Sequence, residues 1–198
     1  MSATYSESEM MGLALEEAAL ALSEREVPVG CVFASPCPAT AGAWLAPLAR
    51  AHNRTNASYS PLQHAEMVGL NALVAGLPAG SEPCLERLRQ LLAGATLFVT
   101  VEPCIMCADA LAKAGVRHVV YGCPNDKFGG CGTVARVFPG SSGGGSSSSS
   151  SGAAAAGGEG ASCTVRSGVR ASEAVALLKQ FYARSNDRAV AAKVAQGP

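Results

Sequence analysis

The sequence predicts an α/β fold, in which helices and β-strands alternate along a single chain of 198 residues. Two observations support this prediction. Residues 96–101 read TLFVTV, a run rich in β-branched and aromatic residues that is typical of a buried strand. A helix is expected over residues 104–114 and another strand over 118–121. So short a strand–helix–strand unit predicts two parallel strands joined by a right-handed crossover.

The N-terminal part predicts one helix and two further strands. Ser6 and Glu9 have the spacing of a capping box, which marks the start of the first helix. Residues 29–33 form an apolar run typical of a short buried strand. Residues 34–48 are rich in Pro and Ala, so we expect a variable hairpin region there, with a return strand near 48–53.

Apolar residues at helical spacing predict three more helices, one beginning near His64, one over 85–92 and one over 171–183. The core face of the helix that begins near His64 is expected to consist of Met67, Leu70, Val74 and Leu77. The inward face of the last helix is expected to hold Val175, Leu178, and Phe181 or Tyr182.

The length of the chain suits one domain, expected over residues 1–185 and followed by a flexible tail at 186–198. Residues 139–161 are nearly all Ser, Gly and Ala, which predicts a disordered insertion, because such a segment buries no apolar surface. Long insertions in surface loops cost little, so we interpret this one as neutral rather than as a functional tether.

The composition excludes two broad classes of protein. Hydrophobic residues make up 48% of the chain, which excludes wholesale disorder. The net charge is zero, whereas a stand-alone nucleic-acid binder usually has an excess of Lys and Arg. Cations do gather locally over residues 165–198. That stretch is the best candidate for binding a polyanion, and the alternative interpretation is an ordinary solvated helix face.

The distribution of apolar and charged residues also predicts a compartment. No run of 18 apolar residues occurs, so no membrane span is expected. Residues 1–9 are polar and acidic, so neither a signal peptide nor a transit peptide is expected. The eight cysteines are therefore expected to be reduced thiols or metal ligands, in a protein of the cytoplasm and/or nucleus.

Two short motifs point to a metal site with hydrolytic chemistry. His64-Ala65-Glu66 supplies one imidazole and one carboxylate, and Pro103-Cys104-Ile105-Met106-Cys107 supplies two thiols. A catalytic zinc takes three protein ligands and leaves one position for water, whereas a structural zinc is closed by four. We therefore assign His64, Cys104 and Cys107 as ligands of one catalytic Zn²⁺.

The spacing within each motif suits these roles. Cys104 and Cys107 are three residues apart, so both thiols leave one face of a first helical turn, where Pro103 suits a helix start. Glu66 is two residues after His64, so it points about 200° round the helix and is poorly placed as an adjacent ligand. We assign Glu66 as the general base that moves protons between water and substrate.

Each motif alone has simpler interpretations. A lone CxxC is often a redox pair or half of a structural zinc site. A closed structural site would need a fourth cysteine, and the candidates are Cys31, Cys123, Cys131 and Cys163, which by default are buried apolar thiols. His52 and His118 have no such neighbours in sequence and are interpreted as structural or surface residues.

The pair of motifs resembles the cytidine-deaminase-like superfamily, whose zinc base deaminases share the signature H-x-E with P-C-x-x-C. Beyond the motifs, the sequence is similar to the tRNA adenosine deaminases in EVPVGC (26–31) and at Asn53. The segments at 120–134 and 168–175 resemble the catalytic subunit of the eukaryotic heterodimeric enzyme. The similarity covers most of residues 7–185.

This resemblance implies a three-layer α/β/α cytidine-deaminase-like fold with a central mixed five-stranded sheet. It implies hydrolysis of adenosine to inosine at the wobble position of tRNA anticodons, with one zinc and a related, non-catalytic partner subunit. It assigns substrate binding to Asn53, with Val29, Ala65 and Pro103 beside it. The residues suggested for RNA contact are Lys127, Phe128, Arg166 and Arg170.

Two other functions remain open on the sequence alone. A deaminase of a free base or nucleotide, such as cytosine, guanine or deoxycytidylate, would use the same metal site. A non-catalytic scaffold subunit stabilised by zinc would keep the ligands without using Glu66.

The C-terminal tail departs from the family that the sequence resembles. The extreme C-terminus of the family is often basic, and here Arg188 and Lys193 are the only basic residues of the tail.

Overall fold

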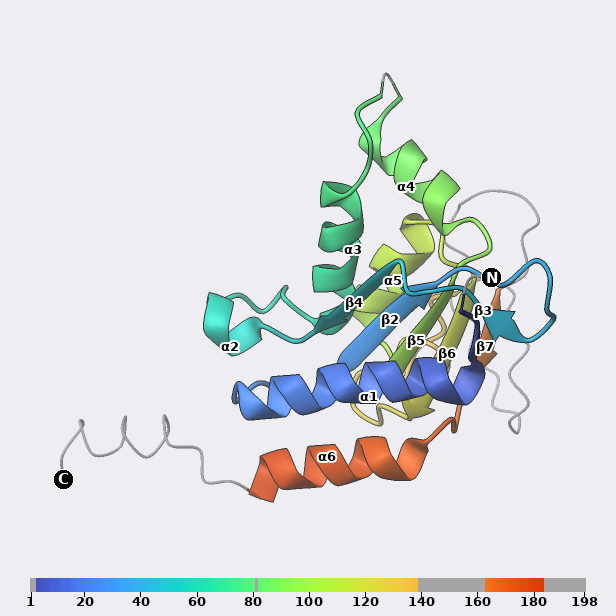
Figure 1. The fold of residues 1–198 in the computed structure, drawn as a ribbon. Coiled ribbons are helices and arrows are strands. Elements are labelled where there is room, and N and C mark those ends of the chain that lie inside the picture. The colour runs from blue at the N-terminus through green and yellow to red at the C-terminus, as the bar shows by residue number, and fades with distance from the viewer. Residues whose placement is uncertain (1–2, 81, 139–162, 184–198) are drawn as a thin grey trace, which may run out of the picture.

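The computed structural model describes residues 3–80, 82–138 and 163–183 (Figure 1). Helices and strands are interspersed along these residues, as expected of the predicted α/β fold. Their order is β1 (Tyr5–Ser6), α1 (Glu7–Ser23), β2 (Gly30–Ala34), β3 (Ala43–Trp44), β4 (Ala49–His52), α2 (Thr55–Ser58), α3 (Ala65–Ala75), α4 (Cys84–Leu92), β5 (Thr96–Val101), α5 (Ile105–Lys113), β6 (His118–Cys123), β7 (Thr164–Arg166) and α6 (Ala171–Ala183).

The main sheet has five strands in the order β4-β2-β5-β6-β7. Strand β2 is antiparallel to β4 and β5, whereas β5, β6 and β7 run parallel to one another. Thr96 of β5 lies opposite His118 of β6, which confirms the predicted parallel pair. The mixed five-stranded sheet confirms the fold class that the resemblance implies. The apolar pattern did not predict β7, because Thr164–Arg166 is short and only partly buried.

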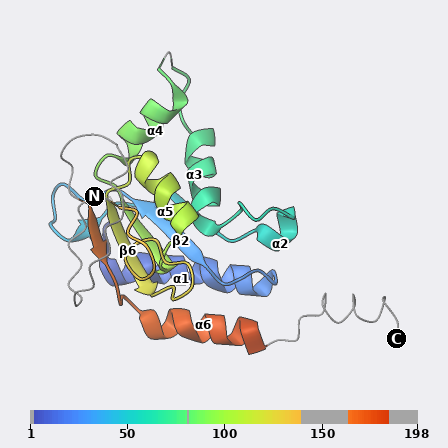
Figure 2. The same cartoon turned by 180° about the vertical axis from the view of Figure 1, so that it is seen from behind.

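Helices cover both faces of this sheet and give three layers (Figures 1 and 2). Helices α1 and α6 lie on one face, and α3 and α5 lie on the other. Alternate side chains of β2 enter the two resulting cores. Val32 packs in a cluster with Met10 of α1 and Ala174 of α6, whereas Phe33 packs with Leu70 of α3 and Leu111 of α5.

The start of α1 is the capping box that the sequence predicts. The Glu9 backbone N–H donates to the Ser6 side-chain oxygen at 3.3 Å, and the Ser6 backbone N–H donates to the Glu9 carboxylate at 2.7 Å. These bonds satisfy backbone donors that the first turn of a helix otherwise leaves without partners.

One core assignment from helical spacing is wrong. Val74 of α3 is 38% exposed, and Leu73 is buried in its place, whereas Leu70 is buried as predicted. In α6, Val175 and Leu178 pack against the core as predicted. Of the two residues predicted as alternatives, Phe181 is partly buried and Tyr182 is 71% exposed.

The domain limits stay predictions, because the insertion at 139–161 and the tail at 186–198 lie outside the described residues. Within the described residues, no helix combines the length and the hydropathy that crossing a membrane requires.

Candidate active site

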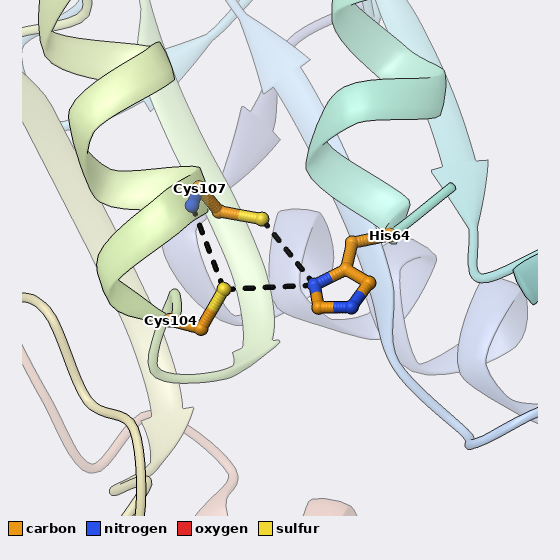
Figure 3. A group of neighbouring side chains, drawn as sticks. All are labelled: His64, Cys104 and Cys107. Carbon is orange, nitrogen blue, oxygen red and sulfur yellow. Dashed lines mark hydrogen bonds between the residues drawn. The ribbon is translucent and has the colours of Figure 1, made fainter. Parts of the chain in front are cut away.

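Two helix N-termini meet on the α3/α5 face of the sheet and bring the predicted ligands together (Figure 3). His64 is the N-cap of α3, and Cys104 is the N-cap of α5. Cys107 lies in the first turn of α5, where its backbone N–H donates to the Cys104 sulfur at 3.5 Å. Pro103 precedes the N-cap, one position earlier than a first helical residue, and its carbonyl accepts a hydrogen bond from Gly130 at 2.8 Å.

The three donor atoms form a compact set. The His64 Nδ1 atom lies 3.6 Å from Cys104 Sγ and 3.5 Å from Cys107 Sγ. All three ligand atoms lie within 4.8 Å of one another, and one imidazole nitrogen with two sulfurs is a donor set that zinc prefers. Among the described residues, no fourth His, Cys, Asp or Glu joins this group. The four alternative cysteines are all described and buried elsewhere: Cys31, Cys123, Cys131 and Cys163.

The three donors also perturb one another electrostatically. The pKa of the Cys104 thiol is lowered to about 4, chiefly by a hydrogen bond from the Cys107 side chain and further by His64. The same hydrogen bond, together with burial, raises the pKa of Cys107. The hydrogen bond with Cys104 raises the pKa of His64. Cys104 is therefore held as a thiolate, which is the form in which cysteine binds a metal.

Glu66 lies beside this donor set without belonging to it. It is in the first turn of α3, is 3% exposed, and lines the same pocket as His64 and Cys104. Burial raises the pKa of its carboxyl group. A carboxyl group with a raised pKa next to a metal site is suited to taking up and releasing a proton during a reaction.

A pocket of about 520 Å³ opens over Glu66. One wall comes from the residues just before β2 and just after β4, another wall comes from the loop after β6, and α6 adds to the lining. The lining residues are Val27, Val29, Asn53, Thr55, His64, Glu66, Val101, Glu102, Cys104, Pro124, Asn125, Asp126, Lys127, Phe128, Leu178 and Tyr182.

Asn53 has a fixed orientation in this pocket. Its side-chain oxygen accepts a hydrogen bond of 2.8 Å from the backbone N–H of Ala65, the first residue of α3. The side-chain nitrogen of Asn53 is therefore the group available to a substrate acceptor. Ala65 itself is fully buried, so it orients Asn53 from behind the pocket.

The predicted binding residues fall into two groups. Val29, Asn53, Lys127 and Phe128 line the pocket, and Phe128 is 62% exposed at its edge. Ala65 and Pro103 are buried and do not line it. Arg166 and Arg170 also lie outside the lining. Arg166 pairs with Glu7 at 3.2 Å, and Arg170 pairs with Glu173 at 2.5 Å.

The two histidines interpreted as structural or surface residues lie outside the pocket lining. His52 hydrogen-bonds to Glu17, and His118 hydrogen-bonds to Thr164.

Sequence reasoning missed two buried carboxylates that hold the walls of the pocket. Glu26 accepts hydrogen bonds from the Thr55 hydroxyl and from the backbone N–H groups of Asn56 and Ala57 at 2.7–3.0 Å. Glu102 accepts bonds from the loop after β6. Full burial of a Glu is rare. For Glu102, the available signal was its place directly after the apolar strand β5.

The chain resembles known proteins along most of its length. Residues 4–123 match the family described as the cytidine and deoxycytidylate deaminase zinc-binding region. A tRNA-specific adenosine deaminase 2 from Danio rerio is 36% identical over 184 residues, which cover 93% of this chain and 74% of that protein. The tRNA-specific adenosine deaminase subunit tad2 from Schizosaccharomyces pombe is 35% identical over 90% of this chain, which spans only 38% of the yeast protein.

A solved structure agrees with these relatives. It comes from a study of A-to-I editing by tRNA:A34 deaminases at the wobble position of transfer RNA. It superposes with a TM-score of 0.61 and 29% identity, over 86% of this chain and 99% of its own. The predicted zinc donors and Glu66 therefore lie in a fold that is shared with a solved tRNA deaminase structure. The chain belongs to the cytidine and deoxycytidylate deaminase zinc-binding family, among the tRNA-specific adenosine deaminases.

Proposed function

We propose that this chain hydrolyses adenosine to inosine at the wobble position of tRNA anticodons, as the catalytic subunit of a heterodimer. The observation on which this rests is Glu66, which is buried beside a donor set of three residues and faces a pocket. The identity of the substrate is supported by relatives named tRNA-specific adenosine deaminases, one of them covered over 74% of its length.

The residues around the pocket fit this hydrolysis. His64, Cys104 and Cys107 would hold zinc, which supplies Lewis-acid activation of water. Glu66 takes a proton from the attacking water and gives it to a ring nitrogen of adenine, and the water oxygen bonds to the carbon that bears the amine. Glu66 then moves the second proton of that oxygen to the amine, the carbon–nitrogen bond breaks and ammonia leaves. Asn53 orients the nucleoside by a hydrogen bond that its side-chain nitrogen donates.

The edge of the pocket suits a nucleotide that has left a base stack. The reacting base must reach the donor set, so it enters the pocket unpaired and unstacked. Phe128 offers an exposed ring for stacking on a neighbouring base, and Lys127 offers a cation for a phosphate. Arg166 and Arg170 already pair with acidic neighbours, which makes them the weaker RNA candidates.

A related subunit without the catalytic Glu is the proposed partner. The yeast relative is itself named a subunit, which supports an assembly of more than one chain. The net charge of this chain is zero, so we expect the partner to supply many of the phosphate contacts that dominate affinity for RNA. Because tRNA is the proposed substrate, the cytoplasm and/or nucleus is the proposed compartment, which microscopy of the tagged chain tests.

The direct test is to incubate the chain with a tRNA that carries adenosine at the wobble position and to read inosine by sequencing. The chain is assayed alone and with the candidate partner, and we expect inosine only with the partner. The same preparations receive free guanine, cytosine and deoxycytidylate. Deamination of one of these small molecules without a partner, and none of the tRNA, would replace our proposal with a free-nucleotide enzyme.

A further inference from the structure

Glu102 is a buried carboxylate to which the deamination chemistry assigns no role. It follows β5 directly, is 1% exposed, and lines the pocket. One of its oxygens accepts from the backbone N–H of Asn125 at 3.0 Å and from the Thr133 hydroxyl. The other accepts from the backbone N–H groups of Cys131 at 3.0 Å and Thr133 at 3.2 Å. A buried charge is costly unless it is hydrogen-bonded, and here one loop provides these donors.

These bonds hold the two ends of the same loop. Asn125 lies at its start, and Cys131 and Thr133 lie at its end. The residues between them include Lys127 and Phe128, which line the pocket. A carboxylate has two acceptor oxygens in one rigid plane, so Glu102 fixes the distance between the ends of the loop and thereby its shape.

The middle of the loop is closely packed, so that neither of its two adjacent glycines leaves room for a Cβ atom. A Cβ atom added to Gly129 would lie 2.5 Å from a Glu102 carboxylate oxygen, and one added to Gly130 would lie 2.7 Å from Ala108 Cβ. The Phe128 carbonyl also accepts from the Ile105 N–H at 2.9 Å. The wall of the pocket is thus joined directly to the helix turn that carries the two cysteines.

We propose that Glu102 is a positioning residue for RNA recognition, because it fixes the pocket wall from Asn125 to Phe128. The inference rests on the proposed function, since the wall matters only for a substrate that reaches past the reacting base. The zinc donors are held by bonds that do not involve Glu102, such as the Cys107 N–H to Cys104. The effect of losing Glu102 therefore falls on substrate binding more than on the chemical step.

The test is Glu102→Gln in the full chain with its partner. Gln keeps the shape of the side chain but turns a donor toward a backbone N–H, so one end of the loop is released. We expect the KM for wobble-adenosine tRNA to rise about tenfold or more, with kcat changed less than about threefold and zinc content unchanged. An unchanged KM, a loss confined to kcat, or loss of zinc would each overturn the proposal.

A second variant covers the case in which Glu102→Gln does not fold. Thr133→Val removes only the hydroxyl donor and keeps the backbone N–H, so we expect the KM to rise about threefold with kcat retained. A wild-type KM in that variant contradicts the proposal. The matched control is Glu17→Gln, a buried carboxylate that bonds to Arg50 and His52 and does not line the pocket.

The wild-type assay separates the two levels of inference. If the wild-type complex forms no inosine, the proposed function is wrong. If the wild type is active and both variants keep its KM, only the role of Glu102 is wrong.

Discussion

Glu66 and Glu102 are both buried carboxylates that line the same pocket, yet their surroundings differ in kind. Glu102 accepts hydrogen bonds from three backbone N–H groups and one hydroxyl, all from one loop. Glu66 lies beside the metal donors, and burial raises the pKa of its carboxyl group. The surroundings thus divide the roles. Glu102 is held by hydrogen bonds from one loop and supports structure, whereas Glu66, whose pKa burial raises, can exchange protons beside the metal donors.

Removing a metal donor tests the Glu66 side of this comparison and has the largest expected effect. In Cys107→Ser we expect loss of zinc, loss of deamination and a lower melting temperature, because metal binding contributes folding free energy. Zinc analysis and thermal unfolding give the readouts. The control is Cys37→Ser, since Cys37 is a partly exposed free thiol outside the donor set. Normal zinc stoichiometry in Cys107→Ser would contradict the ligand assignment.

Glu66→Gln separates proton transfer from folding. We expect single-turnover inosine formation to fall about 10³-fold or more, because Gln cannot take a proton from water. Zinc content and the free energy of unfolding should match the wild type, since Gln fills the same space. A non-catalytic scaffold predicts the opposite result, which is full activity of the assembled complex.

Gly129→Ala tests how tightly the loop after β6 packs against Glu102. The new methyl group would lie 2.5 Å from the Glu102 carboxylate and 2.7 Å from the Asn125 carbonyl oxygen. We expect the free energy of unfolding to fall by about 1–3 kcal/mol in urea titration. Gly76→Ala is the control, because its Cβ would meet nothing closer than 3.6 Å. If the two variants are equally stable, the loop that contains Gly129 can shift to admit the methyl group without losing stability.

Ser6→Ala has the smallest expected effect and lies outside the pocket. It removes the side-chain acceptor of the capping box at the start of α1. Loss of such a cap costs about 1 kcal/mol of folding stability. Inosine formation by the variant should equal that of the wild type at a temperature where both are folded. Reduced kcat would connect α1 to the chemistry in a way that the structure does not suggest.

The parts of the site that the sequence predicted depend on neighbours in the chain. His64, Cys104 and Cys107 were recognisable because three- and four-residue motifs at helix starts fix their geometry locally. The role of Glu102 was missed because its donors lie 23–31 residues later. Periodicity predicts which face of a helix or strand is buried. It does not show which loops meet at the end of a sheet.

The fold shows the same division between local and distant information. Strand β5 matches the predicted range of 96–101 because it is a continuous run of strand-forming residues, and α6 matches 171–183 because its apolar residues have helical spacing. Strand β7 has three residues and pairs with β6 across a long gap in sequence, so its own pattern is too short to predict it. Val74 was misplaced because its exposure depends on how α3 is rotated against the sheet.

The two walls of the pocket are fastened by separate carboxylates, Glu26 on one side and Glu102 on the other. Neither anchor shares a hydrogen-bond donor with the other. Each wall can therefore change without removing a hydrogen bond from the anchor of the other. The loop after β6 also bonds to Pro103 and Ile105, beside the cysteine donors. For protein engineering, substitutions that retarget this loop should therefore keep those two backbone hydrogen bonds.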